Sequence, residues 1–414
     1  MNLLKRKIFI SIFTAVFCLL GIQKIAVAQE RQVDRLIILG DSLSDDGGNN
    51  STLYLLKTMN GETGDAGIDH IQPWVRSWLS DRIPGYGWFC SWKLVPCRTV
   101  ERGILSAAIS ILTVSKAVPV LPAKHYDNGR WSNGLLWPEY LSKKMGIPTS
   151  NKQRYINVSH AGGWTLCLTD KIIGIGDLFG DLTKVAKDMI NGSLIPPCLD
   201  LIAKGVHYKY GDYRPNDLAV VFFGGNDYLN LYQDPQRVVN VQAEVIEQEI
   251  EHGARNIAWL NMPDISLTPR YISGGAKDKA AETKRLIDLN NQLQEDKYRE
   301  LNRKYESKGV KLVLVDANAI FKGIMDNANS YGFKDIHDPC SRIPTPGIDD
   351  TNLEETNPSL RAANEMATPN GQICQHPEQY MFWDSVHPTT ITHKIIADKA
   401  CDILKENGFY CNNG

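Results

Sequence analysis

Several features are missing from this 414-residue sequence, and each absence argues against a class of protein. No Cys-x-x-Cys pair occurs, which argues against a zinc ribbon or a thioredoxin-type redox site. No Gly-x-Ser-x-Gly motif occurs, which argues against the general α/β-hydrolase fold with its nucleophile elbow. There is no internal repeat and no basic stripe, and the formal net charge is −2. Without a cluster of cations to neutralise phosphates, the chain is not expected to bind nucleic acid.

The N-terminal 28 residues have the parts of a secretory signal peptide. A basic start at residues 5–7 precedes an apolar stretch at 8–22, which is short for a membrane span. Residues 26–28, Ala-Val-Ala, form a small-residue cleavage site. We therefore expect cleavage after Ala28 and a secreted protein, extracellular or periplasmic. Removal of this segment moves the net charge to −6, because it carries four basic residues and no acidic one.

Eight cysteines follow the signal segment, and an even number in an exported chain indicates disulfides. They are Cys90, Cys97, Cys167, Cys198, Cys340, Cys374, Cys401 and Cys411. Sequential pairing is the simplest connectivity, although the sequence cannot choose among the alternatives. The interval 340–374 is rich in proline, asparagine and acidic residues, so we expect an exposed loop with a disulfide at its base.

Short apolar runs that end at turn residues alternate along the chain with stretches of helical periodicity. We expect strands at residues 36–39, 155–159, 217–223, 256–262 and 310–315. We expect helices at 135–145, 238–249, 278–305 and 390–404, and a further one beginning near Thr52. This alternation predicts βαβ crossovers and a parallel sheet covered by helices on both faces. The expected organisation is one domain over residues 29–414.

An insertion is expected at about residues 61–124, after the first helix. It contains many aromatic side chains and an apolar stretch from Ile104 to Leu121 that is too polar for a membrane span. This stretch either packs on its own domain or acts as a lid or a lipid-facing helix.

Gly40-Asp41-Ser42 follows the first expected strand directly. Ligands of open α/β sheets bind outside the carboxyl ends of the strands, so a serine at this point would expose its hydroxyl there. A neutral hydroxyl is a poor nucleophile and needs a base. His387 is the candidate base, because Asp384 precedes it by three residues and one turn could bring both to the same crevice. The carboxylate would then orient the imidazole and stabilise its charged form.

Donors for an oxyanion are the third requirement of such a site. Asn226 follows the third expected strand, and Gly162 follows the second. The side chain of Asn226 and the backbone N–H of Gly162 could meet beside Ser42, because parallel strands end at one edge of the sheet.

Four blocks of the sequence resemble, in their order, the GDSL or SGNH esterases and lipases. They are Gly40-Asp-Ser-Leu-Ser-Asp45, Asn157-Val-Ser-His-Ala-Gly162, Gly224-Gly-Asn-Asp227 and Asp384-Ser-Val-His-Pro388. The resemblance implies a flavodoxin-like three-layer α/β/α SGNH hydrolase with Ser42 as nucleophile, His387 as base and Asp384 as its orienting partner. It also implies an oxyanion hole made by the N–H groups of Ser42 and Gly162 and the side chain of Asn226.

Two departures from the family pattern matter. The first block carries an additional residue, and the second has Ser159 and Gly163 where alanines are commoner. The second departure leaves Gly163 as an alternative donor to Gly162.

Export, the aromatic insertion and the cysteine-bounded loop make the chain similar to the bacterial secreted phospholipases and glycerophospholipid–cholesterol acyltransferases. The resemblance implies a serine ester hydrolase of the phospholipase A or lysophospholipase type, with phospholipid or lysophospholipid as substrate and cholesterol as an acyl acceptor. It implies transient contact with a membrane surface and no cofactor or metal. It also suggests that a protease nicks the loop 340–374 and so raises activity.

Three other interpretations remain open. A carbohydrate or short-chain acetyl-esterase would use the same residues in a polar, shallow pocket. A non-catalytic secreted binding or adhesion protein would not need Ser42. A metal-dependent phosphohydrolase would use Asp41, Asp45 and Asp46, but few other oxygen ligands accompany them in the sequence.

Overall fold

The computed structural model describes residues 30–48, 76, 80, 85–91, 97–103, 126–166, 198–229, 232–342 and 372–412. The expected signal peptide 1–28, the helix near Thr52 and the stretch from Ile104 to Leu121 lie outside these residues. Most of the insertion 61–124 and of the loop 340–374 also lies outside them.

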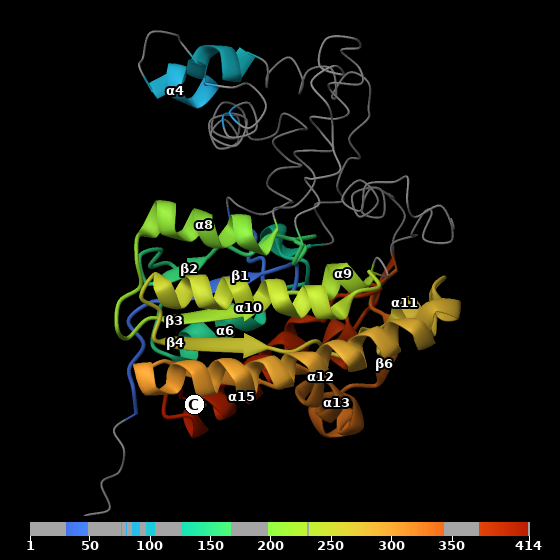
Figure 1. Ribbon diagram of the computed structural model, residues 1–414. Helices are drawn as coiled ribbons and strands as arrows, with labels where there is room; N and C mark the ends of the chain where they lie inside the picture. The colour runs from blue at the N-terminus through green and yellow to red at the C-terminus, as the bar shows by residue number, and fades with distance from the viewer. Residues whose placement is uncertain are drawn as a thin grey trace, which may run out of the picture.

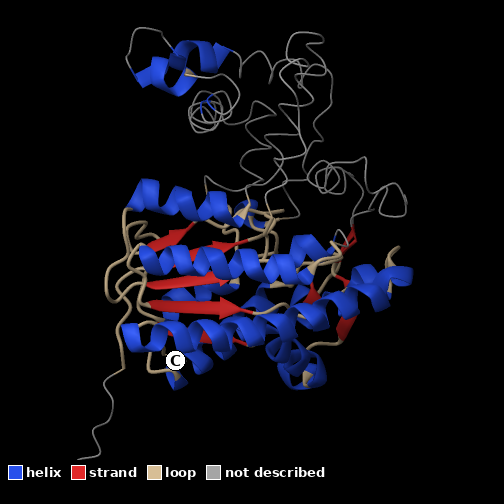
Figure 2. Cartoon of the chain, viewed as in Figure 1, coloured by secondary structure: helices blue, strands red, loops and turns tan. Residues whose placement is uncertain are grey.

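A five-stranded parallel sheet forms the centre of the fold (Figures 1 and 2). In chain order its strands are β1 (Leu36–Gly40), β2 (Tyr155–Asn157), β3 (Leu218–Phe222), β4 (Asn256–Leu260) and β5 (Lys311–Val315). Their order across the sheet is β2-β1-β3-β4-β5, and each neighbouring pair is parallel. All five strands expected from the sequence are present. This is the flavodoxin-like strand order, in which the chain changes direction across the sheet at β1 and β3.

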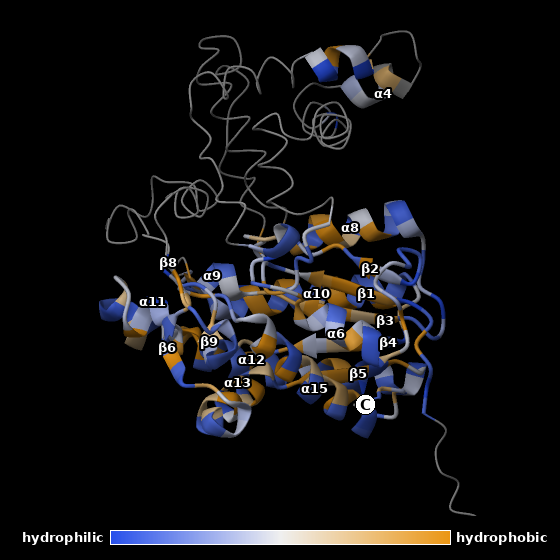
Figure 3. Cartoon of the chain, turned by 180° about the vertical axis from the view of Figure 1, so that it is seen from behind, coloured by the Kyte–Doolittle hydropathy of each residue, from blue (hydrophilic) through white to orange (hydrophobic). Residues whose placement is uncertain are grey.

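Helices cover both faces of this sheet, which confirms the three-layer α/β/α arrangement (Figures 1 and 3). The helices on one face are α8 (Leu199–Tyr210), α10 (Pro235–Glu251) and α12 (Ala280–Tyr305). Those on the other face are α6 (Trp137–Lys144), α13 (Ala317–Asp326) and α15 (Thr390–Glu406). Of these six, α8 and α13 are additional to the helices expected from the sequence.

The continuous apolar run of β1 follows from its position in the middle of these layers. Leu36 and Ile38 pack into the core that contains α6, α13 and α15, whereas Ile37 and Leu39 pack into the core that contains α8 and α10. Successive side chains of a strand point to opposite faces, so a strand buried on both faces needs apolar residues at every position.

Side-chain caps fix where two of the helices next to the carboxyl edge begin. The Asp316 carboxylate accepts the N–H of Ala319 at 2.9 Å at the start of α13. The Thr389 hydroxyl accepts the N–H of Thr392 at the start of α15. Such caps pair N–H groups that a helix cannot satisfy internally. Consequently α15 begins immediately after the stretch that contains His387.

Shorter elements complete the described part of the chain. They are α4 (Tyr86–Ser91), α9 (Gly225–Leu229), α11 (Pro269–Ile272), the parallel pair β6 (Asp335–Pro339) and β9 (Tyr380–Phe382), and the antiparallel pair β7 (Ser341–Arg342) and β8 (Gln372–Ile373). The 3-10 helices are Asp127–Gly129, Ile265–Leu267, Lys277–Lys279, Glu306–Lys308, Ala328–Tyr331 and Pro377–Gln379. No helix in the described ranges combines the length and hydropathy that a membrane span requires.

Sequential pairing of the cysteines is confirmed for three pairs. The disulfides are Cys90–Cys97, Cys340–Cys374 and Cys401–Cys411. Cys198 is also disulfide-bonded, and Cys167 lies outside the described residues. The loop 340–374 is therefore closed at its base, as its composition and flanking cysteines predict.

Candidate active site

Ser42 lies in a tight turn at the carboxyl end of β1. The N–H groups of Ser44 and Asp45 both donate to the Asp41 carbonyl oxygen at 3.0 Å, and the Asp41 carboxylate accepts the N–H of Leu43 at the same distance. The N–H of Ser42 has no acceptor within the described residues. This turn therefore leaves both the hydroxyl and the N–H of Ser42 available at the edge of the sheet.

Close packing against the loop after β2 explains the glycine at position 40. A Cβ atom there would lie 2.7 Å from Ser44 Cβ and 2.9 Å from Ser159 Oγ, which is closer than non-bonded atoms approach. Hydrogen bonds also join the two segments: Asn157 Nδ2 donates to the Ser44 carbonyl at 2.7 Å. The first and second sequence blocks therefore form one rigid unit around Ser42.

His387 and Asp384 come together with Ser42. His387 Nε2 lies 2.9 Å from Ser42 Oγ, and His387 Nδ1 lies 2.7 Å from Asp384 Oδ2. The other carboxylate oxygen, Asp384 Oδ1, accepts the N–H groups of Val386 at 2.8 Å and of His387 at 2.7 Å. Hydroxyl, imidazole and carboxylate thus form a continuous chain of hydrogen bonds, and the Asp384 and His387 side chains are mostly buried.

The charge state of Asp384 follows from these contacts. Burial by itself would raise its pKa, but the charge on His387 and the hydrogen bonds to Asp384 outweigh burial and hold the pKa below its ordinary value. Asp384 is therefore an anion at neutral pH, as a partner that stabilises a charged imidazole must be.

Two aromatic residues next to the hydrogen-bonded chain of Ser42, His387 and Asp384 were not singled out from the sequence. The Tyr126 hydroxyl donates to Asp384 Oδ2 at 2.8 Å. The Trp131 ring lies 5.0 Å from the His387 ring, centroid to centroid. Trp131 belongs to the polar stretch 128–134, which is anchored nearby because Ser132 Oγ donates to the Pro388 carbonyl at 2.8 Å. Nothing among the neighbours of Tyr126 along the chain indicated that it would reach Asp384.

The expected oxyanion donors Asn226 and Gly162 follow β3 and β2, the two strands on either side of β1. Asn226 is in α9, directly after β3, and its Nδ2 donates to the Gly163 carbonyl at 2.9 Å. The N–H of Gly163 is already donated to the His160 carbonyl, whereas the N–H of Gly162 has no acceptor within the described residues. Gly162 has a φ of 74°, which favours glycine. Of the two candidate glycines, Gly162 is therefore the one with an available N–H.

Asp227, the residue after Asn226, connects α9 to the loop that follows β2. Its Oδ2 accepts the N–H of Thr165 at 3.0 Å, so α9 holds the loop that contains Gly162. Burial raises the pKa of Asp227 to about 7, although its hydrogen bonds to Thr165 offset part of the effect.

The carboxylates of the acidic residues around Ser42 accept hydrogen bonds from backbone N–H groups. Asp45 accepts the N–H groups of Gly47 and Ala161, and Asp46 accepts that of Gly48. Asp41 is buried, which raises its pKa to about 6, and the Leu43 N–H and the charge on His387 offset part of that rise. These carboxylates serve as turn-forming acceptors, so the arrangement does not favour the metal-dependent phosphohydrolase interpretation.

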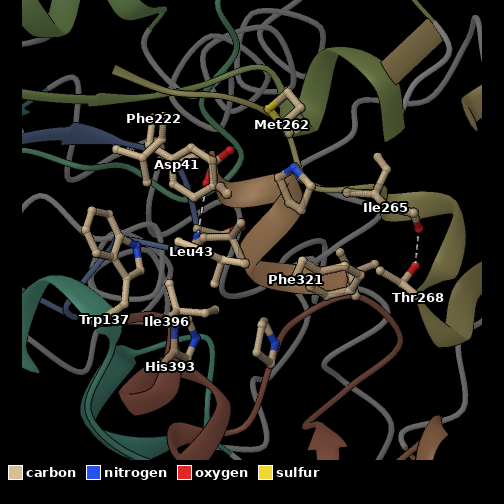
Figure 4. Close-up of a pocket in the computed structure, with 18 of the residues that line it drawn as sticks. Asp41, Leu43, Trp137, Phe222, Met262, Ile265, Thr268, Phe321, His393 and Ile396 are labelled. Carbon is tan, nitrogen blue, oxygen red and sulfur yellow. Dashed lines mark hydrogen bonds between the residues drawn. The ribbon is translucent and has the colours of Figure 1, made fainter. Parts of the chain in front are cut away.

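A pocket with mainly apolar walls opens beside Ser42 and Asn226 (Figure 4). Residues from the ends of β3 and β4 and from α13 and α15 line it, including Phe222, Met262, Phe321 and Ile396. Among the described residues, His393 of α15 is the histidine in its lining. An apolar cavity next to a nucleophile can take a hydrocarbon group of a substrate.

Comparison with known protein families matches residues 36–400 to the family described as GDSL-like lipase/acylhydrolase. Among curated proteins, the thermolabile hemolysin of Vibrio parahaemolyticus is 24% identical over 272 residues, 66% of this chain and 55% of the hemolysin. The secreted effector protein SseJ of Salmonella typhimurium is 27% identical over 285 residues, 67% of this chain and 56% of the effector. The phosphatidylcholine-sterol acyltransferase of Aeromonas hydrophila is 25% identical over 305 residues, 68% of this chain and 82% of the acyltransferase. The chain spans little more than half the length of the first two relatives.

Proposed function

The chain belongs to the GDSL-like lipase/acylhydrolase family, and on that premise we propose that it is a secreted serine hydrolase of lipid acyl esters. Its substrates are phospholipids or lysophospholipids, and Ser42, His387 and Asp384 are its catalytic residues. The observation that carries this proposal is the hydrogen-bonded chain from Ser42 Oγ through His387 to Asp384, next to an apolar pocket.

The reaction proceeds in two halves. Ser42 Oγ attacks the ester carbonyl carbon while His387 Nε2 takes the hydroxyl proton. The tetrahedral intermediate collapses, the ester bond breaks, and His387 returns the proton to the departing alcohol. A water molecule or an acceptor alcohol then loses a proton to His387 and attacks the acyl group on Ser42. When the second intermediate collapses, Ser42 regains its proton and the acyl product leaves.

Three N–H groups stabilise the oxyanion of both intermediates. They are the backbone N–H groups of Ser42 and Gly162, which have no acceptor in the described part of the chain, and the side chain of Asn226. One N–H of the Asn226 amide is donated to the Gly163 carbonyl at 2.9 Å, which fixes the orientation of the amide. Such preorganised donors contribute several kcal/mol to barrier lowering.

The pocket favours a lipid substrate over a carbohydrate acetate. Its walls beside Ser42 are mainly hydrocarbon, including Leu260, Met262 and Phe321. Each methylene buried there contributes about 0.8 kcal/mol, whereas an acetyl group would leave the cavity unfilled. Transfer of the acyl group to cholesterol is part of the proposal, and its support is the likeness to an enzyme named phosphatidylcholine-sterol acyltransferase.

A panel of esters tests the substrate class. We expect kcat/KM for long-chain lysophosphatidylcholine to exceed that for an acetyl ester by roughly tenfold or more, since several methylenes enter the pocket. Products would be quantified by mass spectrometry with vesicles of phosphatidylcholine, with and without cholesterol. Cholesteryl ester should form only in the second case. Faster release of acetate than of long-chain acid would instead favour the carbohydrate or short-chain acetyl-esterase.

Export through residues 1–28 is also part of the proposal. The disulfides of the described residues support it, because such bonds persist outside the reducing cytosol. One relative is itself named a secreted effector protein. At its target, the enzyme contacts the membrane surface transiently to reach its substrate.

Cleavage within residues 341–373 is proposed to raise activity by opening the crevice. The base of this loop is bonded to the segment that precedes Asp384: the N–H of Cys340 donates to the Phe382 carbonyl at 3.0 Å, and that of Ser341 to the Trp383 carbonyl at 2.6 Å. The Cys340–Cys374 disulfide keeps both ends in place after a cut. We expect a nicked sample to hydrolyse lysophosphatidylcholine severalfold faster than an intact one.

A recognition sequence for a site-specific protease, placed inside the loop, makes this comparison clean. The same protease acting on the unaltered chain is the matched control for treatment alone. Equal rates for the nicked and intact forms of the altered chain would show that the loop does not restrict the crevice.

A further inference from the structure

His393 is a buried polar residue in the wall of the apolar pocket. It lies in the first turn of α15, and its exposed fraction is 0%. Neither ring nitrogen, Nδ1 nor Nε2, has a hydrogen-bond partner within the described residues. Figure 4 draws it with Trp137, Leu43 and Ile396, which line the same pocket. The catalytic steps use His387 and give His393 no role.

The imidazole of His393 is neutral at ordinary pH. Burial lowers its pKa to about 3, and the charge on His387 acts in the same direction. A neutral imidazole carries one N–H donor and one nitrogen acceptor. Leaving both unpaired in an apolar interior costs free energy, so a group in the pocket that can hydrogen-bond has an advantage over one that cannot.

The shape and lining of the pocket limit what that group can be. Ser42 and Asn226 line it, and so do Ile320 and Ala400, on the helices α13 and α15. An occupant attached to Ser42 must therefore be hydrocarbon over most of its length. A hydroxyl at one point of its length would pair with one of the two ring nitrogens of His393, because a hydroxyl can donate to the acceptor nitrogen or accept from the N–H.

We propose that the pocket selects acyl chains that carry a hydroxyl group, and that His393 is the residue that recognises this hydroxyl. The inference rests on the proposed function, because it assigns the acyl chain of that reaction to the pocket. An unsubstituted chain displaces any water from His393 and leaves both ring nitrogens unpaired. A site that pairs with a substrate hydroxyl discriminates against the analogue that lacks it.

Binding to the Ser42→Ala variant tests this preference without catalysis. Dissociation constants of stearic acid and of a positional series of hydroxystearic acids would be measured by displacement of a fluorescent fatty acid. We expect one or more hydroxy isomers to bind about tenfold more tightly than stearic acid. Equal or weaker binding of every hydroxy isomer would overturn the proposal.

Two substitutions at position 393, in the same Ser42→Ala background, assign the effect to the imidazole. His393→Leu removes both polar atoms. It should reduce the tenfold ratio of the two dissociation constants to about one, mainly by weakening the binding of the hydroxy acid. His393→Gln keeps a donor and an acceptor and should retain part of the ratio. Circular dichroism would check that His393→Leu is folded. An unchanged ratio in this variant would show that His393 does not bind the hydroxyl.

The proposed function can fail separately. If the wild-type chain does not react with a fluorophosphonate at Ser42 but the binding ratio holds, the hydrolase assignment fails while the pocket preference stands. If labelling is normal and no hydroxy isomer binds better than stearic acid, the preference fails while the hydrolase assignment stands.

Discussion

Ser42→Ala should lower kcat for lysophosphatidylcholine hydrolysis by roughly 10⁴- to 10⁶-fold and abolish labelling by a fluorophosphonate probe. The reason is that the substitution removes the proposed nucleophile, Ser42 Oγ, which lies within hydrogen-bond distance of His387 Nε2. The residual rate would come from the oxyanion donors and from substrate binding. Release of fatty acid and in-gel fluorescence of the labelled chain measure the two effects.

Ser44→Ala is the matched control for this experiment. Ser44 lies in the same turn, but its hydroxyl accepts Trp137 Nε1 at 3.1 Å and is fully buried. The substitution leaves that indole N–H unpaired and should cost about 1–3 kcal/mol of stability while labelling persists. If Ser42→Ala kept the full biological effect of the chain, the non-catalytic binding or adhesion interpretation would replace the hydrolase.

Asp384→Asn should lower kcat by roughly 10⁴-fold with the fold intact. The Asn amide can turn its NH₂ toward His387 Nδ1, which fixes the imidazole in the tautomer that cannot accept the Ser42 proton. The variant also removes the anion that stabilises a charged His387. A soluble ester assayed between pH 5 and pH 9 would give kcat for both proteins. More than a tenth of the wild-type kcat in the variant would contradict the orienting role.

The lowered pKa of Asp384 determines the direction in which protein stability changes with pH. Its ionised form is favoured in the folded state, so its contribution to stability is present above the unfolded-state pKa of about 3.9. That contribution is lost as the pH falls through the still lower folded-state pKa. Loss of activity between pH 5 and pH 7 therefore cannot come from protonation of Asp384.

Tyr126→Phe is the control that separates orientation from charge. It removes the hydroxyl that donates to Asp384 Oδ2 but keeps the ring and the carboxylate. Because Tyr126 is a positioning residue, Tyr126→Phe should lower kcat by roughly tenfold and leave KM unchanged. A hydrogen bond to a charged group contributes about 1.5–3 kcal/mol. A purely structural role would instead lower thermal stability without this division between kcat and KM.

The pocket shows where the sequence was least informative. Ala317, Ile320 and Phe321 line it, and all three belong to α13, a helix additional to those expected. His393 falls within the expected helix 390–404, yet nothing in its neighbours along the chain indicates a cavity. Which face of α15 borders a void depends on how α13 packs against it, and that is a property of the assembled layers.

The sequence by itself determined the sheet, four of the six helices that cover it, and the position of Ser42, His387, Gly162 and Asn226 at strand ends or in turns. Those features are local: apolar runs, turn residues and short spacings act between neighbours along the chain. Only the tertiary structure decided that Tyr126 reaches Asp384, 258 residues away, and that the Gly163 carbonyl holds the Asn226 amide. Such contacts depend on the packing of all the intervening segments, because their free energy is gained only when the layers close together.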